Sequence, residues 1–165
     1  MSGGRLADLR GAAREGLGVA WAKVTRAYLR SVAAAAVIHD ADGRILLVEN
    51  AFLHRAWGLP GGRLERGEEA RAGLAREVHE ETGLVVEVGA LLTVVVRRAG
   101  VVLVFAAIVV GGEPRPAPIE IAQLAWLTED EARGRLSSVS RLHLEAALAG
   151  GQAGYLWDPG RPPHG

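Results

Sequence analysis

Three glutamates crowd into one short segment of this chain: Glu77, Glu80 and Glu81, within REVHEETGL at residues 76–84. If the segment is helical, at about 100° per residue, Glu80 and Glu81 project roughly 60° and 40° to either side of Glu77, so the three carboxylates share one narrow face. Glu77 and Glu81 then form a like-charge i,i+4 pair, which costs an isolated helix about 0.2–0.5 kcal/mol. Carboxylates crowded in this way predict a site that binds a cation.

A solvated acidic face is the alternative interpretation, since most runs of charge are solvated faces. That alternative favours opposite charges at i,i+4 spacing, whereas the nearest cation in sequence, Arg76, leaves the helix about 100° away from Glu77. Leu74, Ala75 and Val78 form an adjoining apolar stripe, so the carboxylates run beside the edge that packs on the core. Because the cluster offers oxygen ligands, it favours Mg²⁺ or Mn²⁺ over Zn²⁺.

The residues before this helix, WGLPGGRLERGEE at 57–69, add a second signal. Pro60 biases the preceding residue toward an extended conformation. Gly61 and Gly62 let the backbone approach a ligand closely, where a side chain would block it. Glu68 stands at the entrance of the predicted helix, where the helix dipole favours a carboxylate. A plain turn would explain the glycines alone, but it would not explain them together with the acidic helix.

Residues 62–84, GRLERGEEARAGLAREVHEETGL, resemble the Nudix box without a departure from its pattern. Five residues separate the first glycine from Glu68, seven separate Glu68 from Arg76, and the stretch ends in REVHEETGL. The resemblance extends over about residues 32–149. It implies an α/β/α sandwich of the α+β class, in which a mixed β-sheet lies between helices and the box forms a loop–helix–loop element.

The resemblance also implies a function. Nudix hydrolases cleave nucleoside diphosphates linked to another moiety, and they usually need Mg²⁺. It implies that this chain hydrolyses the diphosphate linkage of a nucleoside diphosphate derivative or a nucleoside triphosphate, by metal-assisted attack of water on phosphorus. Mg²⁺, or Mn²⁺ in its place, would be held by the carboxylates of Glu77, Glu80, Glu81 and Glu68, with the backbone carbonyl of Gly61 as an additional ligand.

Within that mechanism, a carboxylate accepts the proton of the attacking water. Glu77 is the first choice for this general base, with Glu81 or a glutamate outside the box as alternatives. Arg76 is expected to orient a box carboxylate through hydrogen bonds. Glu120 follows a proline-rich loop, where this family often places an extra acidic residue for metal or base contact, although a solvated carboxylate is the commoner case.

Other side chains are weaker candidates for substrate contact. Trp57 and Trp126 could stack on a nucleobase, although core packing is the commoner role. Five arginines could bind phosphate, although each is more often a surface residue: Arg44, Arg55, Arg63, Arg97 and Arg98. The histidines His39, His54 and His79 have no paired spacing suited to metal binding and are treated as incidental.

Two other interpretations stay open. One is a catalytically silent Nudix-like domain that binds a nucleotide and regulates, although a degenerate domain would usually lose a carboxylate of the box. The other is a structural acidic helix, which predicts no bound divalent metal. For the substrate, the proline or tyrosine that marks some Nudix subfamilies beyond the box is missing near AGVV at 99–102. Both nucleotide classes therefore stay open, with a slight preference for diphosphate derivatives.

The composition bounds the class of protein. The chain has 165 residues, 49% of them apolar and 23% charged, which predicts one globular domain. Its 19 Lys and Arg balance 19 Asp and Glu, so charge gives no argument for nucleic acid or membrane binding. The absence of cysteine excludes disulfides and thiol chemistry. No apolar run reaches the roughly 20 residues of a membrane span. We expect a cytoplasmic protein that acts on a small-molecule nucleotide.

Three parts are expected along the chain: an N-terminal helical arm over residues 1–30, a Nudix domain over 31–150 and an irregular tail over 151–165. Apolar residues recur at helical spacing in the arm, which is compatible with a homodimer. We expect strands over 31–39, 44–49, 84–98, 101–112 and 121–127, with a loop over 50–62. Helices are expected over 69–82, from the capping box at Thr128 and Glu131, and over 137–150.

Overall fold

The computed structural model describes residues 31–52, 55–97, 100–149 and 154–158. The expected N-terminal arm, with the homodimer contact that it would offer, lies outside these described residues. The same is true of His54 and Arg98.

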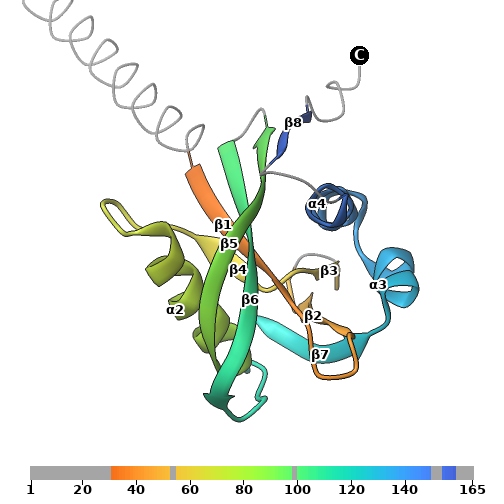
Figure 1. Cartoon of the computed structure of the whole chain (residues 1–165). Helices are drawn as coiled ribbons and strands as arrows, with labels where there is room; N and C mark the ends of the chain where they lie inside the picture. Colours follow the sequence, from red (N-terminus) through yellow and green to blue (C-terminus); the bar gives the residue numbers. More distant parts are fainter. Residues whose placement is uncertain (1–30, 53–54, 98–99, 150–153, 159–165) are drawn as a thin grey trace, which may run out of the picture.

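Five strands form a mixed sheet in the order β4-β1-β6-β5-β8 (Figure 1). They are β1 (Ser31–Ile38), β4 (Gly61–Arg63), β5 (Leu84–Arg97), β6 (Gly100–Gly112) and β8 (Gly154–Asp158). The pairs β1–β6 and β5–β8 are parallel, whereas β1–β4 and β5–β6 are antiparallel. The register of the long β5–β6 pair shifts at bulges, which twist and bend the strands.

A second, antiparallel sheet has the order β3-β2-β7. Its strands are β3 (Trp57–Gly58), β2 (Ile45–Asn50) and β7 (Ile121–Leu127). The strand β3 and the first two residues of β4 fall within residues 50–62, where we expected only a loop. That expectation was wrong because these short strands are rich in glycine and flank a proline, so their own composition gives little strand signal. Pairing with β2 and β1 orders them instead.

The helix that carries the acidic cluster, α2 (Ala70–Thr82), has a cap at each end. Glu69 precedes it in an extended conformation and accepts a hydrogen bond from the backbone N–H of Ala72 at 2.9 Å. Gly83 ends it in the left-handed region, at φ 73°, and donates its N–H to the carbonyl of His79. The predicted helix over 69–82 and its glycine cap are confirmed.

Two further helices follow β7: α3 (Glu129–Arg135) and α4 (Ser138–Leu148). The predicted capping box is present, because the Thr128 side chain accepts from the N–H of Glu131 and the Glu131 carboxylate accepts from the N–H of Thr128. Ser137 caps α4 through its hydroxyl oxygen, which accepts the N–H of Ser140. In the part of the chain that the structure describes, no helix is both long and apolar enough to cross a bilayer.

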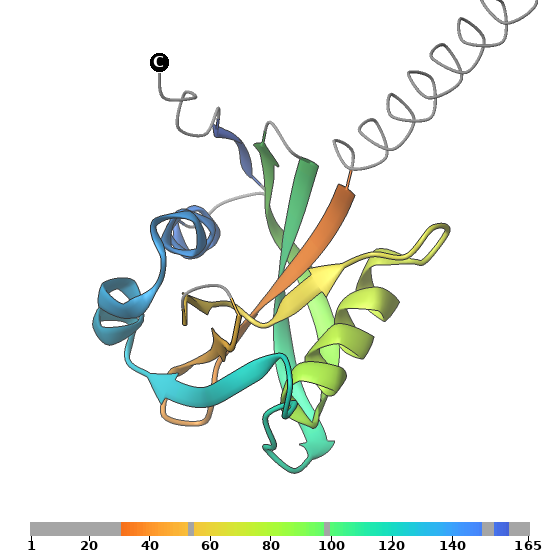
Figure 2. The ribbon, with the colours of Figure 1, turned by 180° about the vertical axis from the view of Figure 1, so that it is seen from behind.

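Alternate side chains of β1 face opposite sides of the mixed sheet, as the two-residue period of a strand requires. One side packs in a cluster with α2: Ala34, Ala36, Ile38, Leu46, Leu74 and Val78. The other side packs in a cluster with α3 and α4: Ala35, Val37, Ala132, Leu136, Leu144 and Ala147. Figures 1 and 2 show α2 on one side of the sheet and α3 and α4 on the other. The predicted α/β/α layering is confirmed.

The tail differs from our expectation at five residues. We expected residues 151–165 to be irregular, but Gly154–Asp158 form β8 and pair in parallel with Thr93–Arg97 of β5. A strand at the edge of a sheet has unpaired backbone groups that a neighbouring segment can satisfy. The free edge of β5 therefore orders this segment, and that edge cannot be inferred from the composition of the tail.

Replacing Leu74 by alanine is expected to destabilise the fold without changing its topology. Leu74 is fully buried between α2 and the sheet, so truncation removes apolar contacts and leaves a cavity. Such substitutions cost about 2–5 kcal/mol. Urea unfolding followed by circular dichroism measures the loss. Ile108→Ala, at an exposed position of β6, is the matched control and should change the free energy of unfolding by less than about 0.5 kcal/mol. Equal effects of the two substitutions would contradict the packing described.

Candidate active site

Arg76 binds three of the four box glutamates that we predicted as metal ligands. Its Nε and Nη2 atoms donate to the two carboxylate oxygens of Glu68 at 2.9 and 3.1 Å. Its Nη1 atom donates to Glu77 Oε1 at 3.0 Å and to Glu80 Oε2 at 3.1 Å. The contact with Glu77 corrects our expectation that Arg76 points away from it. The Cβ directions of neighbouring residues differ by about 100°, but the long arginine side chain reaches back across that angle.

The pair between Arg76 and Glu68 fixes the loop before α2 against the helix. Glu68 also accepts the backbone N–H of Glu65 at 2.8 Å, and the hydrogen bonds from Arg76 and Glu65 lower the pKa of the Glu68 carboxyl. A Cβ on Gly73 of α2 would lie 2.6 Å from Glu68 Oε2, so a larger residue there would displace this carboxylate from its present position. Our sequence analysis did not single out Gly73, although a glycine inside a predicted helix was the available signal.

The two glycines of β4 bring backbone up to the carboxylates of α2. A Cβ on Gly62 would overlap the carboxylate of Glu77. At Gly61, where φ is 139°, a Cβ would overlap the carbonyl oxygen of Ala34 on β1. The predicted close approach of backbone is therefore present, and it places the glycine pair directly against the acidic face of the helix.

Glu81 is held differently from the other three glutamates. Its Oε2 atom accepts the backbone N–H of Gly61 at 2.8 Å. Burial raises the pKa of Glu81 to about 7; the hydrogen bond from Gly61 opposes that shift, and the charges of Glu77, Glu120 and Glu80 add to it. Glu81 is therefore a carboxyl group that takes up and releases a proton near neutral pH when no cation compensates the surrounding charge.

Glu120 comes from outside the box and reaches the same site. The loop before β7 is attached to the end of α2 by a hydrogen bond from the N–H of Ala117 to the carbonyl of Glu81, at 3.0 Å. The carbonyl of Glu120 accepts the N–H of Ala51 at 2.8 Å, which joins this loop to the end of β2. The charge of Glu120 acts on Glu81. Glu77, Glu80 and Glu120 thus lie near enough to Glu81 for their charges to act on it, and Arg76 links Glu68 to Glu77 and Glu80.

Two of the predicted phosphate-binding arginines, Arg44 and Arg55, are paired with carboxylates outside the box. Arg44 is paired with Asp40 at 2.7 Å and Asp42 at 2.9 Å, in the turn between β1 and β2, so the structure does not bring it to the carboxylates. Arg55, at φ 53°, lies in the loop after β2 with its Nη1 atom 3.7 Å from Glu49 Oε2. This pair involves a buried carboxylate that our sequence analysis did not identify, because a glutamate in a strand gives no distinctive pattern.

The tryptophans pack as we expected. Trp57 packs against the cluster below α3 and α4, with the guanidinium of Arg135 lying 5.1 Å from its ring centroid. Trp126 packs against the cluster below α2. Arg63 and Arg97 line a small cavity of about 180 Å³ beside the ends of β4 and β5. His79 lies next to Glu80 and lines a cavity of about 330 Å³ with the proline-rich loop.

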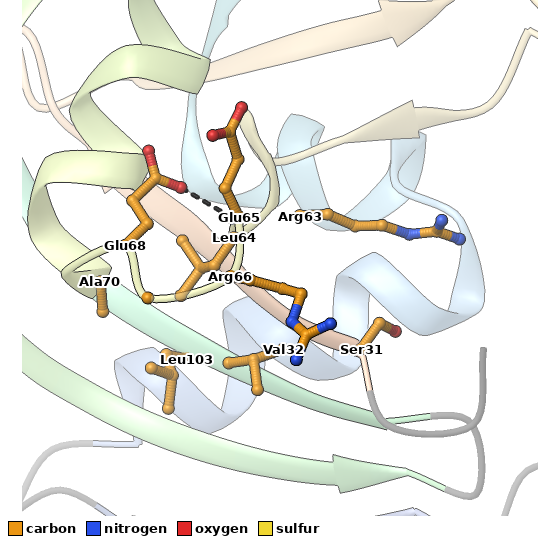
Figure 3. Close-up of a pocket in the computed structure, with 10 residues that line it drawn as sticks. Ser31, Val32, Arg63, Leu64, Glu65, Arg66, Glu68, Ala70 and Leu103 are labelled. Atoms are coloured by element: carbon orange, nitrogen blue, oxygen red, sulfur yellow. Dashed lines mark hydrogen bonds between the residues drawn. The ribbon is translucent and has the colours of Figure 1, made fainter. Parts of the chain in front are cut away.

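A cavity of about 700 Å³ lies beside the loop at residues 64–68 (Figure 3). Its apolar wall includes Val32, Leu64 and Leu103, and Arg66 and Glu68 also line it. Neither Glu77 nor Glu81 is among its lining residues. We therefore place the chemistry at the carboxylates and their glycine backbone, and not in this cavity.

The carboxylates suit a hard divalent cation by their chemistry. Within the described ranges, no three His, Asp or Glu side chains converge tightly enough to hold a metal ion. Three of these carboxylates are instead ion-paired with the guanidinium of Arg76. The donors are nevertheless carboxylate oxygens, which Mg²⁺ prefers, and a cation would relieve the repulsion that acts on Glu81. The donor set therefore fits Mg²⁺ or Mn²⁺.

Comparisons with known proteins show which family model, relatives and solved structures this chain resembles. The sequence model of the NUDIX domain family matches residues 29–146. A MutT-like protein of Streptomyces ambofaciens is 42% identical over 124 residues, which cover 74% of this chain and 79% of that protein. An ADP-ribose pyrophosphatase of Methanocaldococcus jannaschii is 36% identical over 99 residues, which cover 55% of this chain and 59% of that protein. The crystal structure of a MutT NUDIX hydrolase from Burkholderia pseudomallei, 32% identical, matches with a TM-score of 0.59 and covers 71% of this chain and 97% of that chain.

Replacing Glu81 by glutamine is expected to stabilise the metal-free protein at pH 8. The folded-state pKa of Glu81, about 7, lies above the ordinary value of 4.5. The contribution of Glu81 to the free energy of unfolding therefore falls as pH rises from 4.5 to 7. Glutamine keeps an oxygen that can accept the N–H of Gly61 and carries no charge. In EDTA, the midpoint of thermal unfolding should rise by several degrees at pH 8 and change little at pH 4.5.

Glu87→Gln, at an exposed position of β5, is the matched control and should leave the midpoint unchanged at both pH values. A midpoint for Glu81→Gln that is equal to or below that of the wild type at pH 8 would contradict the unfavourable charge assigned to Glu81.

Proposed function

The chain belongs to the NUDIX family, and we propose that it uses Mg²⁺ to cleave a nucleoside diphosphate derivative. The named relatives support the assignment of this chain as a hydrolase that acts on phosphoric anhydride bonds. The observation that carries this proposal is the state of Glu81. Its carboxyl is partly buried among three other glutamates, and its pKa is raised to about 7. Such a concentration of negative charge is unfavourable for folding and useful for binding a cation, as is common at functional sites.

Glu68, Glu77 and Glu80 would hold the cation, with the carbonyl of Gly61 as a further ligand. Bound Mg²⁺ would neutralise charge on the diphosphate and favour the attack of water on phosphorus. Arg76 acts as a positioning residue, because its hydrogen bonds already fix these three carboxylates on one side of α2.

Glu81 is the better candidate for the general base. Our sequence analysis favoured Glu77, but Glu77 is ion-paired with Arg76. Among the hydrogen bonds described above, none joins Arg76 to Glu81, so the Glu81 carboxylate is available to accept a proton. The hydrogen bond from the N–H of Gly61 holds the Glu81 carboxylate in place. Glu120, whose charge reaches Glu81, is the second candidate from the same site.

The substrate is a small-molecule nucleotide. We favour a nucleoside diphosphate joined to another group over a nucleoside triphosphate, since the relative from Methanocaldococcus jannaschii is an ADP-ribose pyrophosphatase. We also infer a cytoplasmic location and no binding of nucleic acid or membrane. A silent domain that binds nucleotides without turnover is the competing function, and a hydrolysis screen separates the two. The screen should contain ADP-ribose, nucleotide sugars, dinucleotides and nucleoside triphosphates.

Replacing Glu80 or Glu81 by glutamine is expected to lower kcat by at least about a hundredfold while the fold is retained, because each removes a charge that acts on the cation or on the attacking water. Steady-state kinetics at saturating Mg²⁺ on the best substrate of the screen measures the loss, and circular dichroism checks the fold. Glu87→Gln serves as the control that removes a carboxylate elsewhere. Wild-type turnover in either site variant would overturn the assignment.

Metal binding has a separate readout that does not depend on turnover. Mg²⁺ or Mn²⁺ should raise the thermal midpoint of the wild type, because a ligand that binds only the folded state stabilises it. The shift should be much smaller in Glu80→Gln, which lacks one of the proposed ligands. A wild type whose midpoint does not respond to either metal would support the interpretation of α2 as a structural acidic helix.

A further inference from the structure

We propose that Phe52 and Ile119 form an apolar clamp that holds the base of the nucleotide substrate beside the carboxylates. The inference rests on the proposed function and deepens it, because it identifies what recognises the part of the substrate that carries no phosphate. The two residues come from different loops, one after β2 and one before β7. We call this pair the apolar clamp.

The first observation is exposure. Phe52 is 71% exposed and Ile119 is 72% exposed, more than any other large apolar side chain within the described ranges. A single exposed apolar residue needs no explanation, but neighbouring ones beside a candidate site favour a binding role. Both side chains would gain free energy from being covered by an apolar group.

A backbone hydrogen bond holds the loops of Phe52 and Ile119 next to each other. The N–H of Ala51 donates to the carbonyl of Glu120 at 2.8 Å. Phe52 directly follows Ala51, and Ile119 directly precedes Glu120. Consecutive Cα atoms are about 3.8 Å apart, and the Cα atoms of two opposite residues in a hydrogen-bonded antiparallel pair are about 5.5 Å apart. The Cα atoms of Phe52 and Ile119 therefore lie within roughly 13 Å of each other. Two large side chains and a planar ring can fill that span.

A second backbone hydrogen bond holds the clamp near the carboxylates. The loop that carries Ile119 is bonded to the end of α2, through the N–H of Ala117 and the carbonyl of Glu81. A substrate with its diphosphate at the carboxylates would therefore have the adjoining nucleoside within reach of the clamp.

Both side chains are carried by ordered turns. The N–H of Phe52 donates to Asn50 Oδ1 at 2.9 Å, and the N–H of Ile121 donates to the carbonyl of Ala117 at 3.0 Å, closing the turn that holds Ile119. Ordering these turns before the ligand arrives lowers the entropic cost of binding. Exposed apolar side chains on fixed backbone suit a ligand better than they suit solvent.

The chemistry of the clamp selects a base over the other parts of the substrate. A phenyl ring and a branched aliphatic side chain offer no charge or hydrogen bond, so neither favours a sugar or a phosphate. Aromatic side chains stack well on nucleobases, and such stacking tolerates any base because every base has a flat face. The clamp therefore contributes affinity for the nucleoside with little choice among bases.

The test compares two non-hydrolysable ligands that differ only by adenosine: α,β-methylene-ADP and methylenediphosphonate. Their dissociation constants are measured by titration calorimetry in Mg²⁺ with the full chain. Phe52→Ala and Ile119→Ala should each weaken binding of α,β-methylene-ADP by roughly tenfold, the loss expected for removing a stacking surface. Binding of methylenediphosphonate should stay within about twofold of the wild type, because neither residue touches the diphosphate.

Ile108→Ala is the matched control, since Ile108 is 59% exposed on β6 and outside the two loops. It should leave both affinities unchanged. Equal loss for both ligands, no loss for either, or no binding of α,β-methylene-ADP by the wild type would overturn the clamp. So would a dimeric wild type that becomes monomeric in Phe52→Ala, because the two residues would then cover a second copy of the chain.

The proposed function and the clamp can fail separately. A wild type that hydrolyses a nucleotide but whose affinity for α,β-methylene-ADP is insensitive to Phe52→Ala overturns the clamp alone. A wild type that binds α,β-methylene-ADP through Phe52 but hydrolyses no diphosphate in the screen keeps the clamp and overturns the proposed hydrolase.

Discussion

The bidentate pair between Arg76 and Glu68 is the interaction on which the site depends. It joins the loop before α2 to the middle of the helix, and the same guanidinium binds Glu77 and Glu80. Without a cation of some kind, carboxylates at this density would repel one another and open the loop from the helix. Arg76 therefore neutralises these carboxylates in the folded protein. A metal ion would also neutralise them, and it would compete with Arg76 for the same oxygens.

Glu81 shows the cost of that arrangement. It lies beyond the reach of Arg76 among the hydrogen bonds described, and a single backbone N–H from Gly61 supports its charge. The energy lost by burying it is not recovered within the folded chain. Such local conflict between stability and composition is expected where a protein prepares a group for reaction, and it contrasts with the consistent packing of Leu74 and Val78 on the other side of the same helix.

The sequence predicted the parts whose signals are local. The periodicity around Leu74 and the caps at Gly83 and Thr128 placed the helices, because capping depends on neighbours only a few residues apart. For the same reason, the sequence spacing of Glu77, Glu80 and Glu81 was enough to predict that they share one side of α2. The rest depends on tertiary contacts. β8 needs the free edge of β5, and the reach of Arg76 depends on its rotamer, so neither could be read from spacing.

Gly73 limits how this protein can be stabilised by substitution. In the middle of a helix, glycine is less favourable than alanine by about 1 kcal/mol, so a designer guided by propensity alone would replace it early. Here the Glu68 carboxylate occupies the space that the methyl group of an alanine would need. A substitution chosen there for helix propensity would therefore push the Glu68 carboxylate away from Arg76, so a gain in helix stability would be opposed by the loss of that pair.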